Sequence, residues 1–144
     1  MDITEYIDIP FLDNGKDRNG LDCWRLVVMF YREKLGIDLP DFSGIYVDGT
    51  LASLKKVTRI IRENKKKWQQ VKKPQPYDVI LIRTGSMVYH AGIVVGRRTM
   101  LHIMEGVNST VEEFTGLMWK DKVEGFYRYR RAHKTKHTAT LPRM

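Results

Sequence analysis

Cysteine is nearly absent from this sequence: the chain of 144 residues has one, Cys23. A single cysteine excludes a disulfide within the chain, and with it the class of small secreted domains that disulfides hold together. Long apolar runs are also absent, since none approaches the roughly 20 residues of a membrane-spanning helix. The first residues, 1–5, are acidic and lack the basic and then apolar order of a signal peptide, so we expect synthesis in the cytoplasm.

Acidic residues are scarce in two segments, and the positive charge of these segments outweighs the rest of the chain, so that the net charge overall is +8. Residues 55–73 hold nine Lys or Arg and one acid, and residues 131–144 hold four and none. A basic excess favours polyanionic partners such as nucleic acid, an anionic membrane or an anionic cell wall. The alternative is a solvated helix face followed by a loose tail. We do not expect nucleic-acid binding, because no array of stacking aromatic residues accompanies the charge.

Hydrophobic spacing predicts two helices in the first half of the chain. In residues 23–35, apolar residues recur at steps of three and four, and Gly36 suits the C-terminal cap. Residues 50–70 repeat the pattern with the lysines on the opposite face. The apolar stripe of this second helix is Leu51, Leu54, Val57, Ile61 and Trp68.

The second half of the chain changes to a strand pattern. Strands are predicted at 77–83, 88–95, 99–105 and 124–130, and the segment 111–119 has room for a short helix. Helices followed by strands predict an α+β fold, with N-terminal helices packed on a small antiparallel sheet. We expect one domain over residues 1–130 and a basic, flexible tail over residues 131–144.

Cys23 lies where the polar loop 13–20 gives way to the first predicted helix. The first turn of a helix presents backbone N–H groups and the positive end of the helix dipole, and both stabilise a thiolate. A lone cysteine in this place, with histidines further along the chain, is a candidate nucleophile. From position alone, a buried core cysteine is an equally good interpretation, because free cysteine is among the most buried residue types.

Two of the four histidines, His90 and His102, favour the catalytic interpretation. A three-residue loop at 96–98 predicts a hairpin in which both histidines share the even-numbered face and are diagonal neighbours. Gly92 then opposes His102 and leaves room for its ring. One imidazole could act as a base and the other could orient it.

We expect the helix of Cys23 to pack on this even face. An imidazolium at His90 would then lower the pKa of the thiol, and His102 would hold His90 in the useful tautomer. A zinc site is the alternative for two histidines and a cysteine, but it needs a fourth ligand or a water, and no further Cys or His spacing supports it. The sequence therefore predicts no metal and no cofactor.

The motifs that surround these residues resemble, in order, those of the NlpC family of cell-wall cysteine peptidases. The family pattern has Gly-Phe-Asp-Cys-Ser-Gly-Leu-Val opening a helix, then Leu-Gly-Ile-x-Leu-Pro, a Pro-Gly-Asp-Leu strand, a His-Val-Gly-Ile-Tyr strand and a second histidine about a dozen residues on. The corresponding stretches are 20–23, 35–40, 77–80, 90–94 and 100–102, and the resemblance spans residues 10 to about 130.

This resemblance implies a compact papain-like fold and a cysteine endopeptidase. Cys23 would be the nucleophile, His90 the base and His102 the group that orients the base. The substrate would be peptidoglycan, cleaved in its stem peptides. An amidase or acyltransferase with the same triad stays open, because the triad determines the attack on a carbonyl and not the final acceptor.

The Asp-Cys-Trp form at residues 22–24 is most similar to family members carried in bacteriophage tails, which open the wall locally during genome ejection. It implies a location in the virion tail after synthesis in the host cytoplasm, with the bacterial cytoplasm as the alternative. Other tail proteins would dock on the basic helix 50–73 and on the C-terminal tail.

Three residues depart from the family pattern. Arg25 stands where the family has a glycine, and it could bind a substrate carboxylate or obstruct the cleft. Phe11 stands where the family usually has a tyrosine whose hydroxyl lies near the active site, and Tyr77 replaces the glycine of Pro-Gly-Asp. Arg25, Asp22 and Phe11 are the candidate substrate-binding residues. Arg25 and Phe11 also motivate an alternative function, a structural tail protein whose peptidase fold is weak or inactive.

Overall fold

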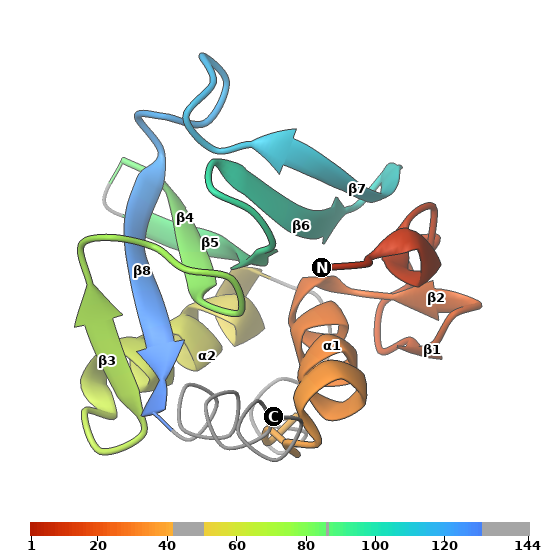
Figure 1. Cartoon of the computed structure of the whole chain (residues 1–144), viewed down its shortest axis with the longest axis horizontal. Coiled ribbons are helices and arrows are strands. Elements are labelled where there is room, and N and C mark those ends of the chain that lie inside the picture. The colour runs from red at the N-terminus through yellow and green to blue at the C-terminus, as the bar shows by residue number, and fades with distance from the viewer. Residues whose placement is uncertain (42–50, 86, 131–144) are drawn as a thin grey trace, which may run out of the picture.

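The computed structural model describes residues 1–41, 51–85 and 87–130 (Figure 1). The predicted tail, 131–144, lies outside the described residues. The elements in chain order are the 3-10 helix η1 (Thr4–Tyr6), β1 (Lys16–Asp17), β2 (Gly20–Leu21), α1 (Cys23–Leu35), α2 (Leu51–Glu63), β3 (Trp68–Val71), β4 (Val79–Thr84), β5 (Met87–Val94), β6 (Thr99–Met104), β7 (Val107–Glu113) and β8 (Val123–Tyr129). Neither of the two described α-helices is long and apolar enough to cross a membrane.

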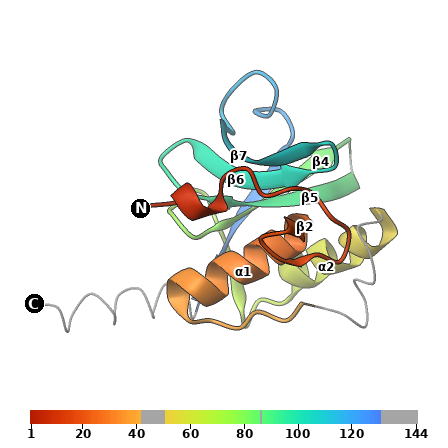
Figure 2. The ribbon, with the colours of Figure 1, turned by 90° about the vertical axis from the view of Figure 1, so that its right-hand side faces the viewer.

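One antiparallel sheet of six strands, in the order β3-β8-β4-β5-β6-β7, organises the fold. Both α-helices lie on one side of this sheet, and the segment between β7 and β8 lies on the other (Figure 2). The predicted α+β class, with helices packed on an antiparallel sheet, is confirmed.

The two faces of the sheet carry separate apolar clusters. The larger cluster joins α1 to the odd-numbered side chains of the β5–β6 hairpin, which are Ala91, Ile93, Leu101 and Ile103. The smaller cluster lies on the other face and contains Ile80, Ile82, Val94, Met100, Phe114 and Trp119. The prediction that the odd positions form the core face is confirmed. The prediction that the helix of Cys23 covers the even face is wrong, because the helix packs where it buries most apolar area.

Helix α1 spans the predicted residues, Cys23–Leu35, and both of its ends have specific caps. The Asp22 carboxylate accepts a hydrogen bond from the Arg25 backbone N–H, which satisfies one of the N–H groups at the helix start. Gly36 adopts the left-handed conformation, φ 66°, and its N–H donates to the Arg32 carbonyl. Its apolar side chains Trp24, Leu26, Val27, Phe30 and Tyr31 are fully buried, each contributing roughly 1.5–3 kcal/mol.

The second helix is shorter than its sequence pattern predicted. It ends at Glu63, and Trp68 begins β3 instead of completing a helical stripe. Trp68 pairs with Tyr129 across β3 and β8, with ring centroids 4.8 Å apart. Aromatic burial across strands thus outweighs local helical spacing. The segment 111–119, where the sequence left room for a short helix, holds none, since β7 occupies Val107–Glu113 and turns follow it.

Tyr77 has a backbone conformation that favours glycine, with φ 80°. A non-glycine residue there costs roughly 1–2 kcal/mol. Its carbonyl accepts a hydrogen bond from the Tyr31 hydroxyl, and its ring packs 5.9 Å from that of Phe30. The glycine that the resembled motif places at this turn is therefore the unstrained residue, and tertiary contacts compensate for the tyrosine here.

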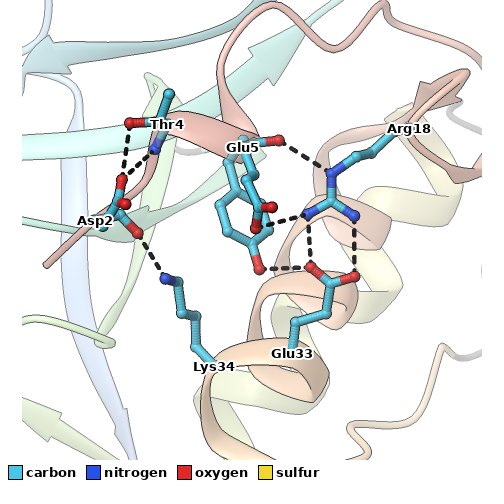
Figure 3. A network of polar contacts seen from close by, with 7 residues as sticks. Asp2, Thr4, Glu5, Arg18, Glu33 and Lys34 are labelled. Atoms are coloured by element: carbon cyan, nitrogen blue, oxygen red, sulfur yellow. Dashed lines mark hydrogen bonds and ion pairs between the residues drawn. The ribbon is translucent and has the colours of Figure 1, made fainter.

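The N-terminal segment is held against α1 by a cluster of polar contacts around Glu33 (Figure 3). Arg18 binds both carboxylate oxygens of Glu33, at 3.0 and 2.7 Å, and the hydroxyl of the buried Tyr6 donates to the same carboxylate at 2.6 Å. Lys34, next on the helix, donates to the Asp2 carbonyl at 2.6 Å. One helix carboxylate therefore joins the 3-10 helix and the β1–β2 loop to α1.

We predict that Glu33→Ala lowers the free energy of unfolding by roughly 1 kcal/mol, a value reduced by solvent screening of the partly exposed Arg18 pair. The hydrogen bond from Arg18, followed by that from Tyr6, lowers the pKa of Glu33 against the effect of burial. The contribution is therefore present above the usual glutamate pKa and is lost as the pH falls below it. Urea unfolding at pH 7 and pH 3 measures both effects. Glu5→Ala is the control, because the Glu5 side chain is 80% exposed and its carboxylate is as far as 4.0 Å from the Arg18 guanidinium. Equal losses of stability in the two variants would contradict the prediction.

Candidate active site

The site forms where strands β5 and β6 separate. Their pairing places Ile93 opposite Leu101 and Val94 opposite Met100, which is the register predicted from the 96–98 loop. Toward the other end of the hairpin, His90 pairs with Ile82 of β4, and His102 pairs with Thr110 of β7. Gly92 makes close packing possible here, since a Cβ at this residue would lie 3.2 Å from the Cβ of His102.

The two histidines are hydrogen-bonded to each other, as the shared face predicted. Nε2 of His90 lies 2.9 Å from Nδ1 of His102, and both residues are buried, at 4% and 1% exposure. The next ring nitrogen, Nε2 of His102, lies 2.6 Å from Oε2 of Glu112 on β7. The sequence analysis does not identify Glu112 as a site residue, because it does not predict a strand at 107–113. Its β-branched residues after Glu105-Gly106 were the available signal.

Burial governs the protonation of the pair. Desolvation, followed by the neighbouring His102, lowers the pKa of His90 to about 3. Desolvation also lowers the pKa of His102, although Glu112 opposes the shift. A ring with a lowered pKa is neutral at pH 7 and can accept a proton. This burial favours a neutral His90, whereas the sequence analysis expects an imidazolium–thiolate pair.

Trp119, from the segment between β7 and β8, covers the two rings on the side away from the helices. Its indole stacks on His90 at 6.3 Å and meets His102 edge-on at 5.3 Å. Trp119 is itself buried, and the ammonium of Lys122 lies 5.7 Å from the centre of its ring. This aromatic cover contributes to the burial of the pair. It was not anticipated from the sequence.

Cys23 opens α1 on the helix-bearing side of the same region. It is buried, at 6% exposure, and belongs to the core cluster that includes Ala91 and Ile103. These two residues follow His90 and His102 along their strands. The thiol also lies in the first turn of the helix, at the positive end of its dipole. The roles of Cys23, His90 and His102 in catalysis remain predictions.

Asp22 and Arg25 form a buried ion pair at the helix start. The Arg25 guanidinium donates to Asp22 Oδ2 at 2.9 Å, and the Asn14 backbone N–H donates to the same oxygen at 3.0 Å. Asp22 is fully buried. The carboxylate thus caps the helix, pairs with the arginine and holds the preceding loop.

Arg25 lies on a different face of α1 from Cys23, because two residues along a helix correspond to a rotation of about 200°. It lines a cavity of about 140 Å³ together with Val28, Met29 and Arg32. Phe11 is half-buried and forms an isolated bridge with Leu21, one residue before Asp22. Contacts of Arg25, Asp22 or Phe11 with a substrate remain predictions.

No group of three or more His, Cys, Asp or Glu side chains suited to a metal ion occurs within residues 1–41, 51–85 and 87–130. The zinc alternative therefore gains no ligand set in this part of the chain.

Comparisons with known proteins identify the family and structures with the same fold. The sequence model described as the NlpC/P60 family matches residues 9–128. A solved structure of an NlpC/P60 family protein from Bacillus cereus is 18% identical with a TM-score of 0.63, covering 88% of this chain and 37% of that one. A Staphylococcus aureus protein, described as similar to lipoprotein and of the NLP/P60 family, is 20% identical with a TM-score of 0.59, covering 87% and 38%.

The NlpC/P60 domain of the peptidoglycan hydrolase SagA is 18% identical with a TM-score of 0.59, and the match covers 87% of this chain and 91% of that domain. The chain thus spans less than half the length of the Bacillus and Staphylococcus proteins and most of the SagA domain. Likeness at these identities shows a shared fold. A search of the curated proteins found no match.

We predict that Asp22→Ala lowers the free energy of unfolding by about 2–4 kcal/mol, because it removes a helix cap and the carboxylate of a buried ion pair together. Chemical denaturation with urea measures the loss. Asp13→Ala is the matched control: Asp13 is exposed in the same loop, and its loss should stay within about 0.5 kcal/mol. A change at Asp22 as small as that at Asp13 would show that the cap and ion pair add little.

Proposed function

The chain belongs to the NlpC/P60 family, and from this premise we propose that it is a cysteine endopeptidase that hydrolyses the stem peptides of peptidoglycan. The observation that carries the proposal is the buried pair of His90 and His102, hydrogen-bonded beside the core cluster that holds Cys23 at the start of α1. Family members are cysteine peptidases that act on peptidoglycan, and SagA, whose NlpC/P60 domain is similar to this chain, is named as a peptidoglycan hydrolase.

The proposed reaction begins with transfer of the thiol proton. Nε2 of His90 faces His102, so we assign to Nδ1 the role of taking the proton from Sγ of Cys23. The thiolate attacks the carbonyl carbon of the scissile amide and forms a tetrahedral intermediate. Its oxyanion would be stabilised by backbone N–H groups in the first turn of α1.

Collapse of this intermediate breaks the C–N bond. The amine leaves with the proton carried by His90, and the acyl group remains on sulfur as a thioester. A water molecule, deprotonated by His90, then attacks the thioester. Release of the carboxylic acid restores the thiol and the neutral imidazole, so that each turnover consumes one water and one amide bond.

The proposed site of action is the tail of a bacteriophage particle, where the protein would open the host wall locally during genome ejection. The support is the Asp-Cys-Trp form at residues 22–24, together with basic segments suited to docking on other tail proteins. The lysines and arginines of α2 that the structure describes, Lys55, Lys56, Arg59 and Arg62, are all exposed. Mass spectrometry of purified virions tests the location, and detection in the host cytoplasm alone would overturn it.

We predict that Cys23→Ala and His90→Ala each reduce muropeptide release from purified peptidoglycan by at least about a thousandfold, because the nucleophile or its base is lost. Chromatography of the released fragments measures the rate. Circular dichroism establishes that each variant is folded, and Arg83→Ala, a partly exposed strand residue, serves as the active control. Unchanged release from folded Cys23→Ala would rule out thiol catalysis, and absence of release from the wild-type protein would favour a structural tail protein.

A further inference from the structure

Glu112 is a carboxylate that contacts the histidine pair through His102. It lies on β7 opposite Met100, and His102 lies opposite Thr110. Glu112 and His102 are thus diagonal neighbours on the same face of two antiparallel strands. The distance of 2.6 Å between Oε2 and Nε2 is that of a charge-assisted hydrogen bond. The Glu112 side chain is 36% exposed, whereas that of His102 is 2% exposed.

This contact determines where the protons lie. An ionised carboxylate can only accept hydrogen bonds, so Nε2 of His102 must carry the proton that is donated to Glu112. A neutral imidazole carries one proton, which leaves Nδ1 of His102 as an acceptor. The partner of that nitrogen is Nε2 of His90, at 2.9 Å. His90 must therefore carry its own proton on Nε2 and leave Nδ1 unprotonated.

We propose that Glu112 is a positioning residue, which acts through His102 to hold His90 in the tautomer whose Nδ1 can accept the thiol proton. The catalytic part of this role rests on the proposed function. The tautomers of the two histidines do not depend on it. The chain of contacts runs Glu112, His102, His90, and the expected fourth member is Cys23.

The alternative proton arrangement would disable the base. If His102 were doubly protonated, its Nδ1–H would donate to Nε2 of His90, and the His90 proton would move to Nδ1. The surroundings of His102 oppose this form. The described groups facing its ring are His90 from β5, Glu112 from β7 and the indole of Trp119. Desolvation among them lowers the pKa of His102 more than Glu112 raises it.

The proton balance of the first step follows directly. The proton leaves Sγ of Cys23 and bonds to Nδ1 of His90, which becomes an imidazolium with a proton on each nitrogen. Its Nε2–H continues to donate to His102, and His102 continues to donate to Glu112. Neither of these outer groups changes protonation. The negative charge of Glu112 stabilises the new positive charge through the intervening ring.

Nitrogen-15 NMR of histidine-labelled protein reads the tautomers directly and needs no substrate. At pH 7 we expect the neutral form with the proton on Nε2 for both His90 and His102. The variants His90→Gln and His102→Gln assign the signals. In Glu112→Ala, the His102 signals should shift to a mixture of tautomers. A wild-type His102 with its proton on Nδ1, or tautomers that are unchanged in Glu112→Ala, would overturn the role of Glu112.

Kinetics on peptidoglycan fragments provide the second test. Glu112→Ala should lower kcat about tenfold or more with little change in KM, as expected for a lost charge-assisted hydrogen bond. Glu112→Gln keeps an acceptor and the side-chain shape, so it should recover part of the rate. Glu113→Ala is the matched control, since Glu113 is exposed and adjacent on β7. Wild-type rates in Glu112→Ala would overturn the proposal.

The two tests separate the two proposals. Expected tautomers without any release of muropeptides overturn the peptidase function alone. Full release together with the opposite tautomers overturns the role of Glu112 alone.

Discussion

The register of three antiparallel strands is the constraint on which the candidate site depends. The pairing of β5 with β6 sets Ile93 opposite Leu101, and the pairing of β6 with β7 sets His102 opposite Thr110. Side chains alternate between faces at every residue, so a slip of one residue would send a histidine to the helix-bearing face. Each face already buries its own apolar cluster. The cost of exposing either cluster therefore maintains the alignment of His90, His102 and Glu112.

The candidate site also needs a fixed position for Cys23, the residue proposed as nucleophile, and the start of helix α1 provides it. Its first nine residues are all buried, whereas a typical surface helix keeps a polar face in water. The one charged side chain in that stretch, Arg25, is paired with Asp22, the same residue that caps the helix. Because a single carboxylate satisfies the backbone and the buried cation, the helix start can lie deep in the core without an uncompensated charge.

The sequence was sufficient where the decisive contacts are local. Gly36 marked the end of α1, and the 96–98 loop set the register that joins His90 to His102. Trp68 shows the limit, since it continues the helical spacing of α2 yet is placed by its pairing with Tyr129, far along the chain. Glu112 was not assigned for a related reason: β7 has few apolar residues, so its β-branched residues are a weaker signal than its pairing with β6. The face that α1 covers was predicted wrongly, because the apolar area of the hairpin, and not its histidines, determines how the helix packs.

The different exposures of the three hydrogen-bonded groups have a physical logic. A carboxylate buried as deeply as His90 would cost several kcal/mol in lost hydration unless it were fully paired. Glu112 avoids this cost because part of its side chain remains in solvent, while Oε2 reaches the buried ring of His102. The two buried imidazoles between Glu112 and the core are neutral, and burying a neutral ring costs much less free energy than burying an ion. In the proposed mechanism, a base with a lowered pKa is weak until the thiol proton arrives, and the oriented rings and Glu112 then stabilise the imidazolium. Orientation of the base is therefore as important to this site as its proton affinity.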